Sequence, residues 1–266
     1  MTMNYSTAPP LASAAQEPLT PDIFFAKHEI NPRYRKFFDQ IPRKTTVIIA
    51  DDSGSMADFA DKDNTASNTT RWDELRTALR IMIDAHAAYG TAVHVYTINQ
   101  GYVLNVMAFE QVAHLFDHAP AGSTNMIRVL GAVAKNHMNE DMGRDLVIHI
   151  LTDGHPTDDR GYENMSELYN WIISRQYKNK TFISVALCCD DRDVEALYRR
   201  LETGKNADLR VDVSMDYRGE LVEIHRTHGF RYEFSYGSYI AKLLIGVFDP
   251  EIHRIDLPTG SCCVVS

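Results

Sequence analysis

Residues 46–55, TVIIADDSGS, contain the pattern that decides the fold. The apolar, β-branched run at residues 46–50 stops abruptly at acidic, small and hydroxyl-bearing residues, which is typical of a buried strand that enters a loop. Asp51, Ser53 and Ser55 alternate along this loop, so a tight turn can direct their side chains toward one point. Carboxylate and hydroxyl oxygens suit a hard cation such as Mg²⁺. The stretch therefore predicts a cation-binding loop at the end of a strand.

Two later segments add polar residues of the same kind. Residues 146–151, LVIHIL, form a second buried-strand pattern that ends in TDG, with Asp153 at its centre. Residues 122–125, GSTN, precede a run with helical spacing and contain Thr124. In open α/β sheets, ligands bind outside the carboxyl ends of the strands, near a topological switch point. Asp51 and Asp153 follow two strands that can flank such a point.

The three pieces, D-x-S-x-S and then a Thr and an Asp on separate loops, resemble the metal-ion-dependent adhesion site (MIDAS) of von Willebrand factor A (vWA) domains, in the order found in that family. The resemblance implies that five residues form a metal site: Asp51, Ser53, Ser55, Thr124 and Asp153. It implies that the three hydroxyls touch the metal directly, whereas the two carboxylates act through bound water. Mg²⁺ is the expected ion, with Mn²⁺ or Ca²⁺ as alternatives. Such an ion keeps a replaceable position, which an Asp or Glu carboxylate of a partner protein is expected to fill.

Strand-like and helix-like patterns alternate along most of the chain, which predicts βαβ units. The expected fold is α/β: a Rossmann-like, doubly wound, mostly parallel sheet with helices on both faces and a short antiparallel edge strand. This is also the fold of the vWA family. Strands are expected at residues 45–50, 91–98, 102–109, 145–151, 182–188 and 209–213, and helices at residues 72–89, 109–116, 126–137, 166–177, 191–201, 219–228 and 239–248.

The composition predicts three regions. Residues 1–43 are expected to form an N-terminal arm that is partly disordered, although the aromatic residues between 24 and 38 indicate that part of it packs on the domain. Residues 44–248 are the predicted vWA domain. Residues 249–266 are the predicted flexible C-terminal tail.

Charge and cysteine content limit the classes of function. A net charge of −9 without a Lys/Arg cluster argues against nucleic-acid binding. No segment has the roughly 20 apolar residues that a membrane-spanning helix needs, and the N-terminus lacks the features of a secretory signal. The four cysteines form two adjacent pairs, at 188–189 and 262–263, which is neither a disulfide framework nor a zinc spacing. Cys188 and Cys189 are expected to be reduced and partly buried.

The last four residues, CVVS, form a C-a-a-X pattern of the type that is usually farnesylated. We expect a prenyl group on Cys263. A single lipid binds a membrane only marginally, so Cys262 is a candidate for a second, palmitoyl, chain. This pattern predicts a cytoplasmic protein that is peripheral on the inner face of a membrane.

The leading hypothesis is an adaptor that binds an acidic partner protein through Mg²⁺ and is tethered by lipid. The alternative is a soluble vWA subunit of a larger assembly, of the chelatase, ATPase-associated or proteasomal type. An enzyme is not expected, because no nucleophile motif is present; a metal-dependent hydrolase would need His155 or Asp52 as its base. The sequence leaves two roles open for Asp52: it caps a turn, or it adds negative charge beside the metal.

Overall fold

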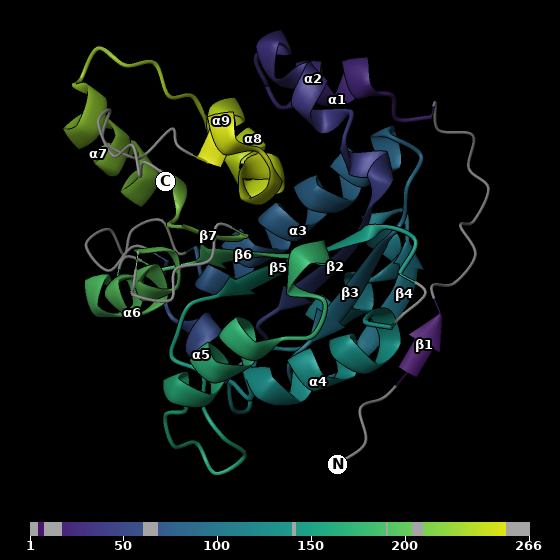
Figure 1. The fold of residues 1–266 in the computed structure, drawn as a ribbon, viewed down its shortest axis with the longest axis vertical. Coiled ribbons are helices and arrows are strands. Elements are labelled where there is room, and N and C mark those ends of the chain that lie inside the picture. Colours follow the sequence, from purple (N-terminus) through teal and green to yellow (C-terminus); the bar gives the residue numbers. More distant parts are fainter. Residues whose placement is uncertain are drawn as a thin grey trace.

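A seven-stranded sheet lies at the centre of the molecule, in the order β1-β4-β3-β2-β5-β6-β7 (Figure 1). The computed structural model describes residues 18–60, 69–139, 142–189, 191–203 and 210–253, together with a strand at residues 5–7. The strands are β1 (Tyr5–Thr7), β2 (Lys44–Ala50), β3 (Val93–Thr97), β4 (Tyr102–Val106), β5 (Asp145–Thr152), β6 (Thr181–Leu187) and β7 (Val211–Ser214).

The pairing confirms the predicted fold class. Every pair of neighbouring strands is parallel except β3 and β4. The predicted short antiparallel strand is β4. It does not form the edge of the sheet, because β1 pairs with its outer side.

Helices cover both faces of the sheet (Figure 1). One face carries α1 (Pro21–Lys27), α2 (Arg35–Phe38), α3 (Arg71–Ala88), α8 (Tyr236–Ile245) and α9 (Pro250–His253). The other face carries α4 (Met126–His137), α5 (Met165–Ser174) and α6 (Arg192–Thr203), and α7 (Tyr217–His228) lies between β7 and α8 in the chain. Single 3-10 turns occur at Pro32–Tyr34, Ile41–Arg43, Gly54–Ala57, Phe109–Gln111, Ala113–Phe116, Lys178–Lys180 and Gly246–Phe248. None of the helices in the described part of the chain is long and apolar enough to cross a membrane.

The apolar run at residues 46–50 belongs to β2, a central strand of this sheet. Val47 and Ile49 belong to the core under α4 and α5, whereas Ile48 and Ala50 belong to the core under α3 and α8. Successive side chains of a strand point to opposite faces. A continuous apolar run therefore fits a strand that is buried on both faces, as central strands of parallel sheets are.

Part of the N-terminal arm packs on the domain, as its aromatic residues predict. Phe24 and Phe38 are fully buried in the same core as α3, and their ring centroids are 6.1 Å apart. A Cβ at Gly237 in α8 would lie 2.4 Å from the carbonyl oxygen of Glu29, so only glycine permits this close approach. The packed region thus starts well before residue 44. It also continues past residue 248, because Ile252 in α9 is 3% exposed. The rest of the predicted arm and tail, including Cys262 and Cys263, lies outside the described residues.

The structure shortens two of the predicted helices. Residues 109–116 form two 3-10 turns instead of one helix. The helix predicted at residues 166–177 ends at Ser174. At this end, Arg175 donates from Nη1 to the carbonyl oxygen of Ile172 in the helix and from Nη2 to that of Thr181 in β6, at 2.5 and 2.9 Å. A side chain that satisfies the last carbonyls of a helix substitutes for the next helical turn.

Candidate metal centre

Three loops meet at the carboxyl ends of β2 and β5. These strands are neighbours in the sheet, with Ala50 opposite Leu151. The chain leaves β2 toward β3 and leaves β5 toward β6, on opposite sides, so this is the switch point at which ligand sites occur. The amide of Gly54 donates to the carbonyl oxygen of Gly122 at 3.2 Å and joins the first loop to the second.

Asp51 is fully buried at the start of the first loop. Its Oδ1 accepts from the amide of Ser53 at 2.9 Å, and its Oδ2 accepts from the hydroxyl of Thr152 at 2.6 Å. Burial, and then the nearby charge of Asp153, raise the pKa of Asp51 to about 6, although the hydrogen bonds from Ser53 and Thr152 act against this rise. The carboxylate is therefore held rigidly where a positive charge would stabilise its ionised form.

Ser53 and Ser55 bring hydroxyls to the second carboxylate. Their Oγ atoms lie 3.3 Å apart, and Ser55 Oγ donates to Asp153 Oδ1 at 2.9 Å. Asp153 is 3% exposed. Four of the five residues in the predicted site thus form one connected cluster of oxygen atoms.

Thr124 lies on the second loop and is 6% exposed. Its backbone is fastened to Thr157: the amide of Thr124 donates to Thr157 Oγ1 at 3.0 Å, and its carbonyl oxygen accepts from the Thr157 amide at 2.9 Å. The hydrogen bonds that the structure records for Thr124 therefore anchor the loop and do not join its hydroxyl to the other four residues.

The hydrogen bonds of Asp52 lead away from this cluster, which favours the capping role of the two that the sequence left open. Its Oδ1 accepts from the backbone amide and the side-chain amide of Asn99, at 2.8 and 3.2 Å. Its carbonyl oxygen accepts from the amide of Ala121 at 2.8 Å. Asp52 therefore ties the loop after β3 and the second loop to the first loop, as a turn-capping residue does.

The position of Asn99 also explains why residue 122 is a glycine. Its φ of +104° is in the region that favours glycine, and a Cβ there would lie 2.8 Å from the Asn99 side chain. The backbone of the second loop can approach Asn99 only because residue 122 has no side chain.

Arg71 is the residue that sequence reasoning missed. Its Nη1 donates to Asp153 Oδ2 at 2.6 Å, and the two side chains are 7% and 0% exposed. Arg71 is the first residue of α3, directly after Thr70, which caps the helix through a reciprocal hydrogen bond with Asp73. A single arginine after a capping threonine gives no signal in the sequence. Only the position of α3 over the sheet brings the guanidinium to the carboxylate.

The two histidines near Asp153 have different surroundings. His149 in β5 is 1% exposed, and burial lowers its pKa to about 3, so it belongs to the core. His155 follows the third loop, and its Nδ1 lies 2.9 Å from Oε1 of Glu163, whose side chain is 73% exposed. The structure therefore gives His155 a partner at the surface.

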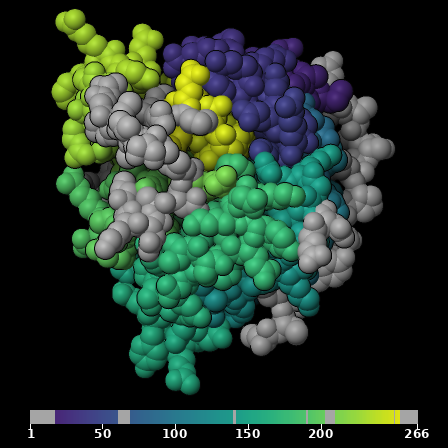
Figure 2. Space-filling view, in the orientation of Figure 1, coloured from purple at the N-terminus to yellow at the C-terminus, as the bar shows by residue number. Residues whose placement is uncertain are grey.

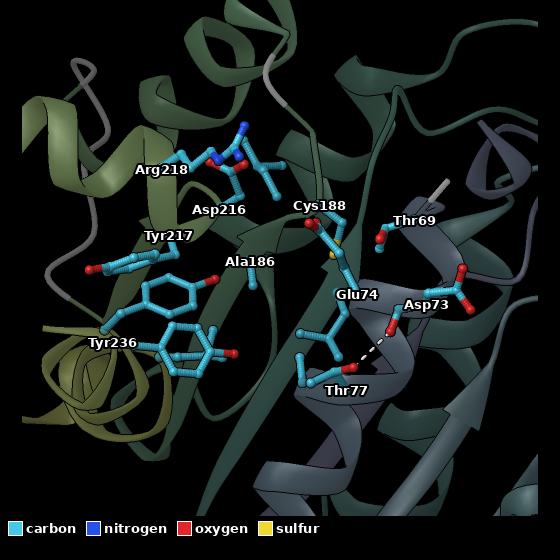
Figure 3. Close-up of a pocket in the computed structure, with 15 residues that line it drawn as sticks. Thr69, Asp73, Glu74, Thr77, Ala186, Cys188, Asp216, Tyr217, Arg218 and Tyr236 are labelled. Atoms are coloured by element: carbon cyan, nitrogen blue, oxygen red, sulfur yellow. Dashed lines mark hydrogen bonds between the residues drawn. The ribbon is translucent and has the colours of Figure 1, made fainter. Parts of the chain in front are cut away.

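A pocket of about 300 Å³ lies beside the loops, between α3 and α8. In Figure 3 the rings of Tyr217 and Tyr236 stand on one side, and Glu74, Thr77 and Cys188 stand on the other. Cys188 and Cys189 are free thiols, and the structure buries both more fully than the partial burial expected from the sequence. Burial, and then the charge of Glu74, raise the pKa of the Cys188 thiol well above its ordinary value. The thiol is therefore unreactive at neutral pH.

The donor atoms of the loops fit a hard divalent cation. Two buried carboxylates and two hydroxyls converge there, and oxygen donors are the set that Mg²⁺ and Ca²⁺ require. Asp51 and Asp153 bring two negative charges, of which Arg71 balances one. One uncompensated negative charge remains at the centre of the loops.

No protein-family model and no curated protein matches the chain. Solved structures that resemble it include the VWA domain of SpRpn10, with 11% identity, a TM-score of 0.46, and coverage of 65% of this chain and 87% of that one. Manganese-loaded TRAP protein of Plasmodium vivax has 14% identity and a TM-score of 0.42, with coverage of 66% and 70%. The pilus adhesin SpaC of Lactobacillus rhamnosus GG has 14% identity and a TM-score of 0.46, and the match covers 77% of this chain but 31% of the adhesin. These likenesses concern the fold alone.

Proposed function

We propose that this chain is a protein-binding module of the vWA type, in which a divalent cation held by the three loops binds a carboxylate of a partner protein. The observation that carries the proposal is the connected cluster of Asp51, Ser53, Ser55 and Asp153 at the switch point of the sheet. Thr124, on the adjoining loop, completes the proposed site. Mg²⁺ is the expected ion, and Mn²⁺ or Ca²⁺ also suits these donors.

The chain's own residues define what the site does. The hydroxyls of Ser53 and Ser55 are neutral donors, so they leave most of the charge of a bound cation available to an anionic ligand. Asp51 and Asp153 are already held by hydrogen bonds, and this fixes their oxygens before any ion arrives. A cation in such a site attracts a partner's carboxylate.

Arg71 supports an anionic partner in a second way. Its guanidinium is buried against Asp153 and adds a permanent positive charge beside the site. It also uses one oxygen of Asp153, so it competes with the cation for that carboxylate. We infer that Arg71 lowers the affinity for metal and favours binding of an acidic partner.

We propose a binding role and not a hydrolytic one. A hydrolase would need a general base within reach of the site. Asp52 is committed to Asn99, and His155 is paired with Glu163. In the described part of the chain, no recorded hydrogen bond joins either side chain to the oxygen cluster of Asp51, Ser53, Ser55 and Asp153.

Calorimetric titration with Mg²⁺ and Mn²⁺ tests the metal site. Wild type is expected to bind one ion at the loops, and Asp51→Ala and Ser53→Ala are expected to lose that binding. Asp159→Ala is the control, because Asp159 is a neighbouring carboxylate with 71% side-chain exposure that pairs with Arg128 outside the cluster. Equal binding by wild type and Asp51→Ala would refute the metal site.

Partner capture tests the function. We expect partners that wild type retains in Mg²⁺ and releases in EDTA, and that Asp51→Ala does not retain. The carboxylate requirement is checked with the captured partner itself, by replacing its candidate Asp or Glu with Asn or Gln. A partner list that does not change with EDTA or with Asp51→Ala contradicts the proposal.

Attachment to a membrane is a separate proposal that depends on Cys263 and Cys262. The two cysteines lie outside the described residues, and the sequence CVVS is its support. The intact mass of the protein from its native host is expected to show an isoprenoid and loss of the last three residues, which also requires Ser266 to be the natural terminus. Cys263→Ser is expected to leave the membrane fraction. An unmodified mass favours the alternative, a soluble subunit of a larger assembly.

A further inference from the structure

A second group of metal-ligating side chains lies outside the three loops. It consists of Glu202 in α6, Asp212 in β7 and His253 in α9. Each offers one ligand atom, and the three atoms lie within 4.8 Å of one another. Residues from three different elements thus converge at the β7 end of the sheet.

Asp212 is the centre of this group. It is 1% exposed, and its Oδ1 lies 2.8 Å from Nδ1 of His253. Its Oδ2 is buried and has no hydrogen-bond partner among the described residues. Leaving a carboxylate oxygen buried without a partner is costly, so a cation beside this oxygen would offset that cost.

The backbone of Gly246 lies close to that oxygen. A Cβ at residue 246 would lie 3.0 Å from Asp212 Oδ2. Any other residue at this position would place a carbon atom against the oxygen.

The fixed cations nearby have other partners. Lys242 Nζ donates to Glu220 Oε2 at 2.6 Å, and both side chains are completely buried. Arg199 is shared between Glu195 and Glu202, at 2.9 and 3.3 Å.

Carboxylates therefore outnumber permanent cations among these side chains. Four carboxylates, those of Glu195, Glu202, Asp212 and Glu220, lie near two permanent cations. Within the cluster of Glu202, Asp212 and His253, the imidazole of His253 is the group that can carry a positive charge, and a divalent cation is the alternative source.

We propose that Glu202, Asp212 and His253 form a second metal site that binds Zn²⁺ or a similar first-row transition ion. Two carboxylates and one imidazole are three protein ligands of the kind that Zn²⁺ accepts, with water in the fourth position. Ligands about 2.1 Å from a tetrahedral ion stand roughly 3.4 Å apart. Closing the cluster from 4.8 Å thus requires side-chain movements of about 1 Å. Hard Mg²⁺ does not suit the imidazole, which distinguishes this site from the three loops.

Binding at this site would join α6, β7 and α9. The ion would hold the C-terminal helix α9 to the outer strand of the sheet, so it would stabilise the folded chain by mass action. The expected effect is a rise in the midpoint of thermal unfolding with Zn²⁺ and not with Mg²⁺.

The experiment uses the full chain with Asp51→Ala as its background, so that the outcome does not depend on the proposed loop site. Zn²⁺ binding is measured by calorimetry after treatment with a chelator. We expect one ion per chain, and a fall in affinity of more than about 100-fold when His253→Gln or Asp212→Asn is added. His118→Gln is the matched control, because His118 is an exposed histidine outside the cluster. Unchanged Zn²⁺ affinity in both variants overturns the proposal.

A second measurement does not depend on the folding of variants. Co²⁺ is added to the same Asp51→Ala chain, and the visible absorption of a four-coordinate oxygen and nitrogen site is expected. Zn²⁺ should remove that absorption at one equivalent. A Co²⁺ spectrum of the hydrated ion, unchanged by the protein, means that the cluster is held by a proton on His253 and overturns the metal site.

Discussion

Arg71 Nη1 and Asp153 Oδ2 lie 2.6 Å apart within the predicted metal site, and neither side chain is more than 7% exposed. A buried ion pair is strongly destabilised when one partner is removed, because the other charge is left uncompensated. The guanidinium therefore supplies part of the positive charge that the loops require, and a cation would supply the rest.

Arg71→Gln is expected to reduce the free energy of unfolding by about 3 kcal/mol without metal. Mg²⁺ should restore part of that loss, because the ion then supplies a positive charge beside Asp153 in place of the guanidinium. Urea unfolding with and without Mg²⁺ measures both effects. Arg226→Gln is the control, since that arginine is 75% exposed in an ion pair at the surface and should change stability by less than about 0.5 kcal/mol. If Mg²⁺ raised the free energy of unfolding by the same amount in wild type and Arg71→Gln, Arg71 and the cation would not share the task of balancing the charge of Asp153.

Binding of Mg²⁺ should weaken as the pH falls through about 6. Burial raises the pKa of Asp51 from 3.8 to about 6 in the folded chain, and the cation needs the ionised carboxylate. Below that pKa the affinity should fall roughly tenfold per pH unit. Without metal the sign reverses: the folded state binds the proton more tightly than the unfolded state, so Asp51 makes the chain more stable as the pH falls from about 6 to 3.8. Calorimetry across this pH range measures the change in Mg²⁺ affinity. Without metal, the gain in stability at low pH should be absent in Asp51→Asn, which checks that Asp51 is the titrating group.

Asp52→Ala should weaken the junction between the metal loops and the loop after β3. The substitution removes the carboxylate that accepts from the backbone amide and the side-chain amide of Asn99, although the side-chain amide still donates to the carbonyl oxygen of Ser123 at 3.1 Å. The expected cost is about 1–3 kcal/mol, with Mg²⁺ affinity reduced far less than by Asp51→Ala. Asp52→Asn keeps the acceptor oxygen and should behave nearly as wild type. Loss of Mg²⁺ binding in Asp52→Asn would mean that Asp52 contributes charge to the site.

Gly122→Ala should destabilise the second loop through both strain and collision. Its φ is +104°, and the added Cβ would meet Asn99 at 2.8 Å. Gly161→Ala is the matched control: its φ is +81°, but nothing lies within 4 Å of its Cβ. Gly161→Ala should cost about 1–2 kcal/mol from backbone strain, and Gly122→Ala clearly more. If thermal unfolding gave equal losses of stability for Gly122→Ala and Gly161→Ala, contact of the added Cβ with Asn99 would not contribute to the loss.

His149→Leu should make the chain more resistant to acid. Burial lowers the pKa of His149 from 6.5 to about 3 in the folded state. The unfolded state therefore binds a proton below about pH 6.5 that the folded state does not, and stability falls with pH down to about 3. The slope that this histidine contributes is up to about 1.4 kcal/mol per pH unit. Unfolding measured from about pH 7 to 4 should show a shallower loss in His149→Leu than in wild type.

The positions of Asp51 and Asp153 show why much of the fold and site was predictable. Asp51 follows an apolar run directly, and Asp153 follows one after Thr152. An apolar run that is buried on both faces fits a central strand of a parallel sheet. The alternation of Asp51, Ser53 and Ser55 is local, and a turn of a few residues decides it. Such patterns depend on neighbours in the chain, so they are visible in the sequence.

Arg71, Asn99 and Asp212 show what could not be predicted. Their partners are residues 153, 52 and 253, which are 82, 47 and 41 positions away. Nothing in the local pattern of an arginine at a helix start, or of an asparagine in a turn, indicates which distant carboxylate it will meet.

The sequence by itself determined the central strands, the order of strands and helices, and the oxygen-rich loops, because the period of burial and the turn residues are local properties. The tertiary structure decided which charges face one another. It placed Arg71 on Asp153, turned Asp52 toward Asn99, and gathered Glu202, Asp212 and His253 at the β7 end of the sheet. The physical reason is that the energy of a buried charge depends on the groups around it in space, and those groups come together only when the sheet and its helices pack.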